Sequence, residues 1–130
     1  MTTPADLRYT KDHEWVRLDD DGLAVIGITD YAQDALGDIV YVDVETGEGD
    51  EVAAEEPFGS VEAVKTVSEL FAPISGTLEA INEALEDTPE TVNADPYGEG
   101  WMIKIRPADP AEVDGLMSAD AYTHMIGEDS

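Results

Sequence analysis

The chain has 130 residues, of which 42% are hydrophobic, and its 31 acidic against 6 basic side chains give a formal net charge of −25. This length suits one domain, and the apolar share is enough to build a core. The charge disfavours binding to nucleic acid or to an anionic membrane surface, because both need a basic face. The absence of cysteine excludes disulfides and thiolate metal sites.

The apolar runs and the N-terminus bear on where the protein acts. No apolar run approaches the roughly 20 residues that span a bilayer. The N-terminus lacks the basic start and following apolar stretch of a signal peptide. We therefore expect a cytoplasmic protein with a single domain over residues 1–130, a core at about 7–125 and a flexible C-terminal tail.

The acidic excess indicates a folded protein covered with solvated carboxylates. Disorder is the less favoured interpretation, because regular apolar runs and two tryptophans are present. Such surfaces are typical of halophiles, since molar salt shortens the Debye length to about 3 Å and screens the repulsion between carboxylates. We expect a halophilic protein, and an ordinary acidic protein with a basic partner is the alternative.

The first elements form a hairpin followed by a helix. Strands are predicted over 13–18 and 23–28, with a turn at 19–22 between them. Three successive aspartates in this turn lack the spacing of a calcium-binding loop, so a solvated turn is the better interpretation. The segment Asp30-Tyr31-Ala32-Gln33 fits a capping box that begins a short helix, and Gly37 can end it.

The rest of the chain continues with short strands. They are predicted over the apolar or β-branched stretches 38–44, 58–63, 67–71, 77–82 and 101–105. The connection 83–92 is polar, with one helical turn possible after Thr88-Pro89, and 93–100 reads as a loop. Short helices are predicted from the cap Asp109 to Gly115, and from the cap Ser118 to about Met125. Many short strands with peripheral helices favour a mainly β sandwich or barrel.

Lys65 is one of only three lysines, and it lies between the strands predicted over 58–63 and 67–71. The residues alone allow an ordinary surface lysine, because Val64-Lys65 is not a favoured hairpin turn. The segment Glu62-Ala63-Val64-Lys65-Thr66, however, resembles the lipoylation segment Glu-Ser-Val-Lys-Ala of the glycine cleavage system H-protein family, with Ala63 in place of the usual serine. The resemblance implies that Lys65 carries lipoic acid in amide linkage, as N6-lipoyllysine.

Further segments resemble the same family, in an uninterrupted order from about residue 7 to residue 125. They include Tyr9-Thr10-Lys11-Asp12-His13-Glu14-Trp15-Val16, Gly27-Ile28-Thr29-Asp30-Tyr31-Ala32-Gln33, Leu36-Gly37-Asp38-Ile39-Val40, Asn82-Glu83-Ala84-Leu85, Pro89, Val92-Asn93 and Asp95-Pro96-Tyr97-Gly98-Glu99-Gly100-Trp101-Met102-Ile103-Lys104-Ile105. The resemblance implies a lipoyl-type β-sandwich, or barrel-sandwich hybrid, with short peripheral helices that include C-terminal ones. It also implies a carrier subunit that is not itself an enzyme.

The resemblance further implies a function and partners. The carrier would shuttle the aminomethyl group of glycine from the pyridoxal-phosphate glycine decarboxylase to the tetrahydrofolate-dependent aminomethyltransferase, and electrons to dihydrolipoyl dehydrogenase. A lipoate ligase, or an octanoyl transferase with lipoyl synthase, would load Lys65. We expect a monomer.

Two acidic residues are candidates for holding the loaded arm. In the family, the glutamate that corresponds to Glu14 lines the cleft where the arm docks, and Glu69 matches the family's acid after the lysine. From strand alternation alone, Glu14 would point to solvent, and His13 would have a structural hydrogen-bonding role. No metal site is expected, because His124 is the only other histidine. Asp12 occupies a position where relatives often carry serine.

Alternative functions remain. An H-like protein that donates lipoyl groups to 2-oxo-acid dehydrogenases would use the same lysine. A biotinyl carrier would have methionines beside the lysine, where Val64 and Thr66 stand, and a lipoyl domain of a 2-oxo-acid dehydrogenase would be shorter and lack His13-Glu14-Trp15. A hydrolase with paired carboxylates has no specific support, because acids are so abundant in this chain.

Overall fold

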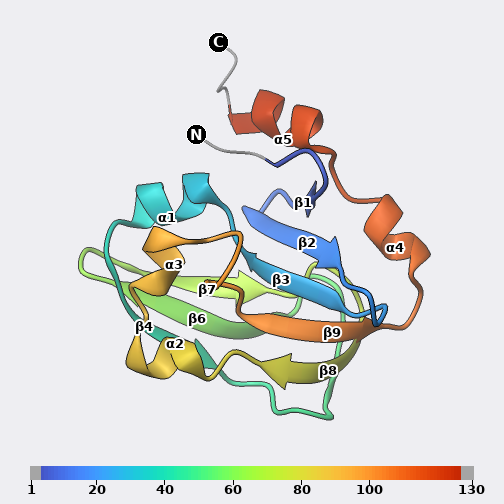
Figure 1. Ribbon diagram of the computed structural model, residues 1–130, viewed down its shortest axis with the longest axis horizontal. Helices are drawn as coiled ribbons and strands as arrows, with labels where there is room; N and C mark the ends of the chain where they lie inside the picture. The colour runs from blue at the N-terminus through green and yellow to red at the C-terminus, as the bar shows by residue number, and fades with distance from the viewer. Residues whose placement is uncertain (1–3, 127–130) are drawn as a thin grey trace.

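Two antiparallel sheets and a set of short helices make up the fold of the computed structural model, which describes residues 4–126 (Figure 1). The six-stranded sheet has the order β1-β2-β3-β9-β8-β5, and the three-stranded sheet has the order β4-β6-β7. The predicted mainly β sandwich with peripheral helices is confirmed. The tail beyond about residue 125 falls almost wholly outside the described residues, and the single-domain assignment stays a prediction.

The elements have the following bounds. The strands are β1 (Arg8–Tyr9), β2 (Glu14–Leu18), β3 (Ala24–Ile28), β4 (Ile39–Val44), β5 (Glu51–Val52), β6 (Pro57–Ala63), β7 (Val67–Phe71), β8 (Gly76–Ile81) and β9 (Ile103–Pro107). The helices are α1 (Asp30–Leu36), α2 (Ala84–Asp87), α3 (Thr91–Ala94), α4 (Ala111–Asp114) and α5 (Ala119–Ile126). Among the described helices, none is long and apolar enough to cross a membrane.

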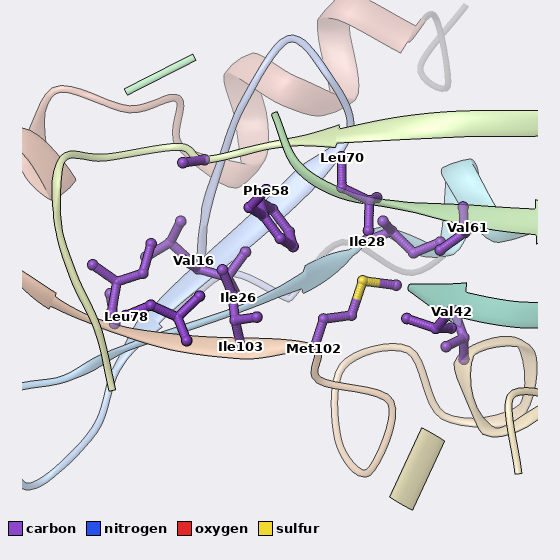
Figure 2. Close-up of a cluster of buried hydrophobic side chains, with 14 of the residues drawn as sticks. Val16, Ile26, Ile28, Val42, Phe58, Val61, Leu70, Leu78, Met102 and Ile103 are labelled. Carbon is purple, nitrogen blue, oxygen red and sulfur yellow. The ribbon is translucent and has the colours of Figure 1, made fainter. Parts of the chain in front are cut away.

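The core lies between the two sheets, and its side chains come from strands far apart in the sequence (Figure 2). Val16 and Ile26 of the larger sheet and Phe58 and Leu70 of the smaller one are all buried. Burial of each such side chain stabilises the fold by about 1.5–3 kcal/mol. A second buried cluster lies where β1, β2 and α5 meet, and it consists of Leu7, Tyr9, Trp15, Val25, Ala119 and Tyr122. Packing of the core between the sheets therefore holds the smaller sheet, with its β6–β7 hairpin, against the larger one.

The β2–β3 hairpin forms as predicted, with Trp15 paired opposite Gly27. A Cβ atom on Gly27 would lie 2.8 Å from Trp15 Nε1, so only glycine leaves room for the indole ring. The indole nitrogen donates a hydrogen bond of 2.9 Å to the carbonyl oxygen of Pro96. This contact joins the hairpin to the connection before β9.

The start of α1 differs by one residue from the prediction. Thr29 is the N-cap, and its hydroxyl accepts a hydrogen bond of 3.1 Å from the Ala32 N–H. Asp30 is therefore the first helical residue, and its carboxylate accepts a bond of 2.7 Å from the Gln33 side-chain amide. Gly37 ends the helix with φ of 86°, as predicted, because this left-handed conformation suits glycine.

Other differences concern short or polar segments. The polar connection 83–100 holds two helical turns, α2 and α3, where one was predicted, and α3 extends into the predicted loop. The strand expected over 101–105 is β9 (Ile103–Pro107), two residues later. The two-residue strands β1 and β5 were not predicted. The cap Ser118 is confirmed, since its hydroxyl accepts a hydrogen bond from the Ala121 N–H. The cap predicted at Asp109 lies one residue later, at Pro110, although the Asp109 carboxylate still accepts a hydrogen bond from the Ala111 N–H.

Candidate functional site

Lys65 lies at the tip of the hairpin formed by β6 and β7, which is the loop at the left edge of the view in Figure 1. The connection is the three-residue loop 64–66, closed by a hydrogen bond of 2.7 Å from the Ala63 N–H to the Thr66 carbonyl. All three loop residues are exposed. The hairpin thus presents a primary amine to solvent on a well-paired support, which is the geometry that an acylating enzyme needs.

The loop between α1 and β4 supports this tip. The Val64 N–H donates a hydrogen bond of 3.1 Å to the Asp38 carbonyl. The stem of Lys65 lies against Gly37, because a Cβ atom on this glycine would be only 3.1 Å from Lys65 Cε. Glycine at position 37 therefore serves both the end of α1 and the space beneath the lysine.

Asn93 of α3 holds that supporting loop in place. Its side-chain oxygen accepts a hydrogen bond of 2.8 Å from the Ile39 N–H. Its amide nitrogen donates bonds of 2.9 Å to the Gln33 side-chain oxygen and to the Gly37 carbonyl. No local sequence signal marks this role, because the three partners lie 54, 60 and 56 residues away along the chain.

Glu14 is buried, with 2% of its surface exposed, so the expectation that it points to solvent is wrong. As the first residue of β2, it reaches the other sheet, where its Oε2 atom accepts a hydrogen bond of 2.7 Å from the Phe71 N–H. Its Oε1 atom is buried and has no hydrogen-bond partner among the described residues. Burial raises the pKa of this carboxyl to about 8, against the opposing effect of the Phe71 N–H.

Glu14 and Glu69 border the same edge of β7. This strand is an edge of the smaller sheet, and the Phe71 N–H points away from β6 toward Glu14. Because backbone groups alternate along a strand, the N–H of Glu69 points to the same side. Glu69 itself is exposed in β7, two residues after the strand begins, and Lys65 lies in the loop before the strand. Glu14 thus contacts the end of β7 at Phe71, and Glu69 is a residue of the same strand, nearer to Lys65.

A cavity of about 310 Å³ lies beside the end of β7. The β1–β2 connection supplies part of its lining, including Thr10, whose hydroxyl accepts a hydrogen bond of 3.3 Å from the Glu14 N–H. At its rim, the Lys11 ammonium donates a hydrogen bond of 2.7 Å to the Glu55 carboxylate, and both side chains are exposed. Asp12 also lines the cavity. The lining of the cavity therefore combines polar groups with apolar side chains such as Ala72.

His13 has the structural role that was predicted for it. Its Nδ1 atom lies 2.9 Å from the Tyr122 hydroxyl, which lies 2.7 Å from the Thr29 hydroxyl. This chain of contacts ties α5 to the N-cap of α1, and burial lowers the pKa of His13. Among residues 4–126, no group of three or more metal-ligating side chains could hold a metal ion.

Comparison with known proteins assigns the family. The family described as Glycine cleavage H-protein matches residues 7–129. The chain is 59% identical over 128 residues to the glycine cleavage system H protein of Chlorobium phaeovibrioides, covering 98% of this chain and 99% of that one. The chain belongs to the glycine cleavage H-protein family. The H protein of Geobacillus kaustophilus is also 59% identical, with the same coverage.

A solved relative has the same fold. The crystal structure of a glycine cleavage system H protein from Mycobacterium marinum superimposes with a TM-score of 0.87 at 41% identity, covering 95% of this chain and 98% of that one. Proteins of this H-protein family are non-catalytic carriers with lipoate attached covalently to a lysine. The chain is therefore a lipoyl-carrying H-protein of the glycine cleavage system, and it works with the other proteins of that system.

Proposed function

We propose that Lys65 is the lysine that carries the lipoyl group. The observation that supports this most strongly is its position, exposed at the tip of the β6–β7 hairpin. The other two lysines are engaged elsewhere: Lys11 pairs with Glu55 at 2.7 Å, and Lys104 lies 3.6 Å from the Asp19 carboxylate. Among the described residues, Lys65 alone of the lysines has no carboxylate within ion-pair distance.

The exposed loop 64–66 suits a lysine whose lipoyl group moves between enzymes. When bound, the lipoyl group supplies a cyclic disulfide that takes up the aminomethyl group of glycine together with electrons. Attachment to Lys65 keeps this group at a high local concentration near each enzyme that the carrier binds in turn. We infer that these enzymes are the pyridoxal-phosphate glycine decarboxylase, the tetrahydrofolate-dependent aminomethyltransferase and dihydrolipoyl dehydrogenase. We also infer that a lipoate ligase, or an octanoyl transferase with lipoyl synthase, attaches the lipoyl group to Lys65. The protein is a monomer in this proposal.

We also propose that Glu14 and Glu69 hold the amine that the arm carries. The buried Oε1 atom of Glu14 lacks a partner in the described structure, and an ammonium group would supply one. A charge-assisted hydrogen bond of this kind contributes about 1.5–3 kcal/mol. Glu69 is an exposed residue of β7 that lies along the chain between Lys65 and Phe71, the residue that Glu14 contacts, so we infer that it contacts the arm on its way to the buried carboxyl.

Peptide mass mapping after incubation with a lipoate ligase tests the attachment site. We expect the lipoyl mass on the peptide that contains Lys65, and no lipoyl mass on peptides with Lys11 or Lys104. The Lys65→Arg variant keeps the charge but offers no acylable amine, so it should stay unmodified. Label on Lys11 or Lys104 with an unmodified Lys65 would overturn the assignment.

The acidic surface supports a proposal about the environment in which the protein works. Residues 4–126 contain three ion pairs, so the basic side chains neutralise few of the 31 acids. We infer that the protein is halophilic, because salt must screen the remaining repulsion. We also infer that it is a cytoplasmic protein made of a single domain.

A further inference from the structure

Exposed apolar side chains gather around the tip of the β6–β7 hairpin. Six large hydrophobic residues are exposed among the described residues. Four of them flank Lys65 in space or in sequence: Val40, Tyr41, Val64 and Val67, with 51%, 48%, 72% and 60% of their surface exposed. We call these four residues the collar.

The strand register makes the collar continuous across the smaller sheet. Tyr41 of β4 lies opposite Glu62 of β6, and Glu62 lies opposite Val67 of β7. Residues directly opposite in a ladder share one face, so these three side chains form a row on the outer face of this sheet. Val40 lies at the irregularity of β4 just before Tyr41. Glu62 and Val67 of this row lie on β6 and β7, the two strands that the loop with Lys65 connects.

The exposed apolar side chains of the collar contrast with the strongly acidic composition of this protein. The chain has a net charge of −25, and apolar groups that are clustered and exposed on such a surface are typical of interaction sites. The core does not account for them, because Val42, next to Tyr41 on β4, and Val61, next to Glu62 on β6, already fill the interior. Two exposed carboxylates border the collar, Glu62 within the row and Asp38 beneath Val64.

The chemistry at Lys65 decides which partner covers the collar. When a lipoate ligase acylates Lys65, Nζ forms a bond to the carbonyl carbon of an acyl adenylate, AMP leaves with the electron pair of the broken C–O bond, and Nζ loses a proton to solvent. The enzyme must therefore bring Nζ itself into its active site and cover the residues on both sides of the lysine. An enzyme that reacts only with the far end of the extended arm has no such need.

We propose that the collar is the docking surface for the enzyme that acylates Lys65. The proposal rests on the function proposed for that lysine. The matching surface of the enzyme is apolar where it meets Tyr41 and Val67, and it carries basic side chains opposite Glu62 and Asp38. Apolar contacts supply the affinity, and the charges orient the hairpin.

Steady-state acylation by a lipoate ligase with lipoate and ATP, followed by intact mass, tests the proposal. We expect Tyr41→Ser and Val67→Ser each to raise the KM for the carrier about tenfold while kcat stays within about twofold, because they remove docking contacts only. Leu18→Ser is the matched control, since Leu18 is 45% exposed on β2 of the other sheet. Its KM should equal that of the unchanged protein.

Each other outcome overturns the proposal. An unchanged KM in both collar variants would show that the ligase does not use this surface. A fall in kcat alone would indicate a distorted hairpin. Normal acylation, with loss only of the later reaction with glycine decarboxylase, would assign the collar to that enzyme. Acylation of another lysine in the unchanged protein would overturn the proposed function as well.

A charge variant gives an independent readout that leaves the apolar side chains intact. Glu62→Lys should raise the KM at low ionic strength, and the difference from the unchanged protein should shrink as salt is added. Thermal unfolding of all variants by circular dichroism checks that they fold. A Glu62→Lys protein with the KM of the unchanged protein at low salt would contradict the basic complement.

Discussion

Glu14 places a carboxyl group where proteins seldom leave one without partners. Its side chain is 2% exposed, and one of its oxygen atoms has no hydrogen-bond partner in the described part of the chain. Burial of an unpaired carboxylate is costly, so the neutral form is favoured and the pKa rises to about 8. A cation beside the Oε1 atom would supply the missing partner, so substitutions of Glu14 test the site directly.

The pH dependence of stability follows from this pKa. The folded protein keeps the Glu14 proton up to about pH 8, whereas the unfolded chain loses it near pH 4.5. The contribution of this group to stability is therefore full below pH 4.5 and is lost as the pH rises through 8. Glu14→Gln cannot ionise, so it should be about 2–5 kcal/mol more stable than the unchanged protein above pH 8, and similar to it at pH 4.5.

Urea unfolding at constant salt from pH 4.5 to pH 9 measures this difference. Glu86→Gln is a suitable control, because Glu86 is exposed on α2. Parallel stability profiles for Glu14→Gln and the unchanged protein would show that Glu14 is ionised alike in the folded and unfolded states.

The lifetime of the loaded carrier should also depend on Glu14. Protein loaded with methylamine slowly releases ammonia and formaldehyde to water, and a contact worth about 1.5–3 kcal/mol slows release by roughly 10- to 100-fold. We therefore expect Glu14→Ala to release ammonia faster by that factor, with no aminomethyltransferase present. Glu86→Ala should behave as the unchanged protein does, and equal lifetimes in all three proteins would remove Glu14 from this role.

The β6–β7 hairpin and its support are the elements that present Lys65. Asn93 joins α3 to the end of α1 and the start of β4, and the loop between them accepts a hydrogen bond from Val64 at the tip. The lysine is thus positioned by a residue on a separate element, far from it in the sequence. Elements that pack against the hairpin are as much a part of the site as the hairpin itself.

Removing the Asn93 side chain should loosen this support. Asn93→Ala loses three hydrogen bonds and leaves the Ile39 N–H and the Gly37 carbonyl without their partner, so we expect a loss of about 2–3 kcal/mol in stability. Urea unfolding measures the loss, and hydrogen exchange should show weaker protection of the Val64 amide. Thr91→Ala on the same helix is the control. Unchanged exchange at Val64 would mean that the tip does not depend on Asn93.

The sequence predicts elements well where the local pattern is strong. The β2–β3 hairpin has two runs with bulky apolar residues around an Asp-Gly turn, and it forms as expected. The N-cap of α1 shifts by one residue because Thr29 and Asp30 are both good capping residues. Two-residue strands such as β1 are too short to show any periodicity. The burial of Glu14 could not be predicted, because it depends on the position of β7 in the other sheet.

The net charge of −25 is a property of the whole molecule, and it lowers stability through repulsion between carboxylates. Three ion pairs in the described residues leave most of the 31 acids without a basic neighbour, and their repulsion is long-ranged at low ionic strength. The fold rests on the core and the hairpins and does not depend on this charge. The stability at a given salt concentration does depend on it.

The melting temperature should therefore rise with salt. Between about 0.1 M and 3 M potassium chloride we expect an increase of about 10 °C or more, as screening removes the repulsion. Circular dichroism at fixed pH follows the transition. A melting temperature that stays flat over this range would contradict the proposal that the protein is halophilic.

The central claim is that glycine cleavage runs through Lys65. The most direct test is glycine cleavage reconstituted from the partner enzymes and carrier protein that has been incubated with a lipoate ligase. The variants to compare are Lys65→Arg, Lys11→Arg and Lys104→Arg. Arginine keeps the charge but cannot form the lipoyl amide, so we predict no cleavage with Lys65→Arg and normal cleavage with the other two. Glycine cleavage that persists with Lys65→Arg would contradict the account.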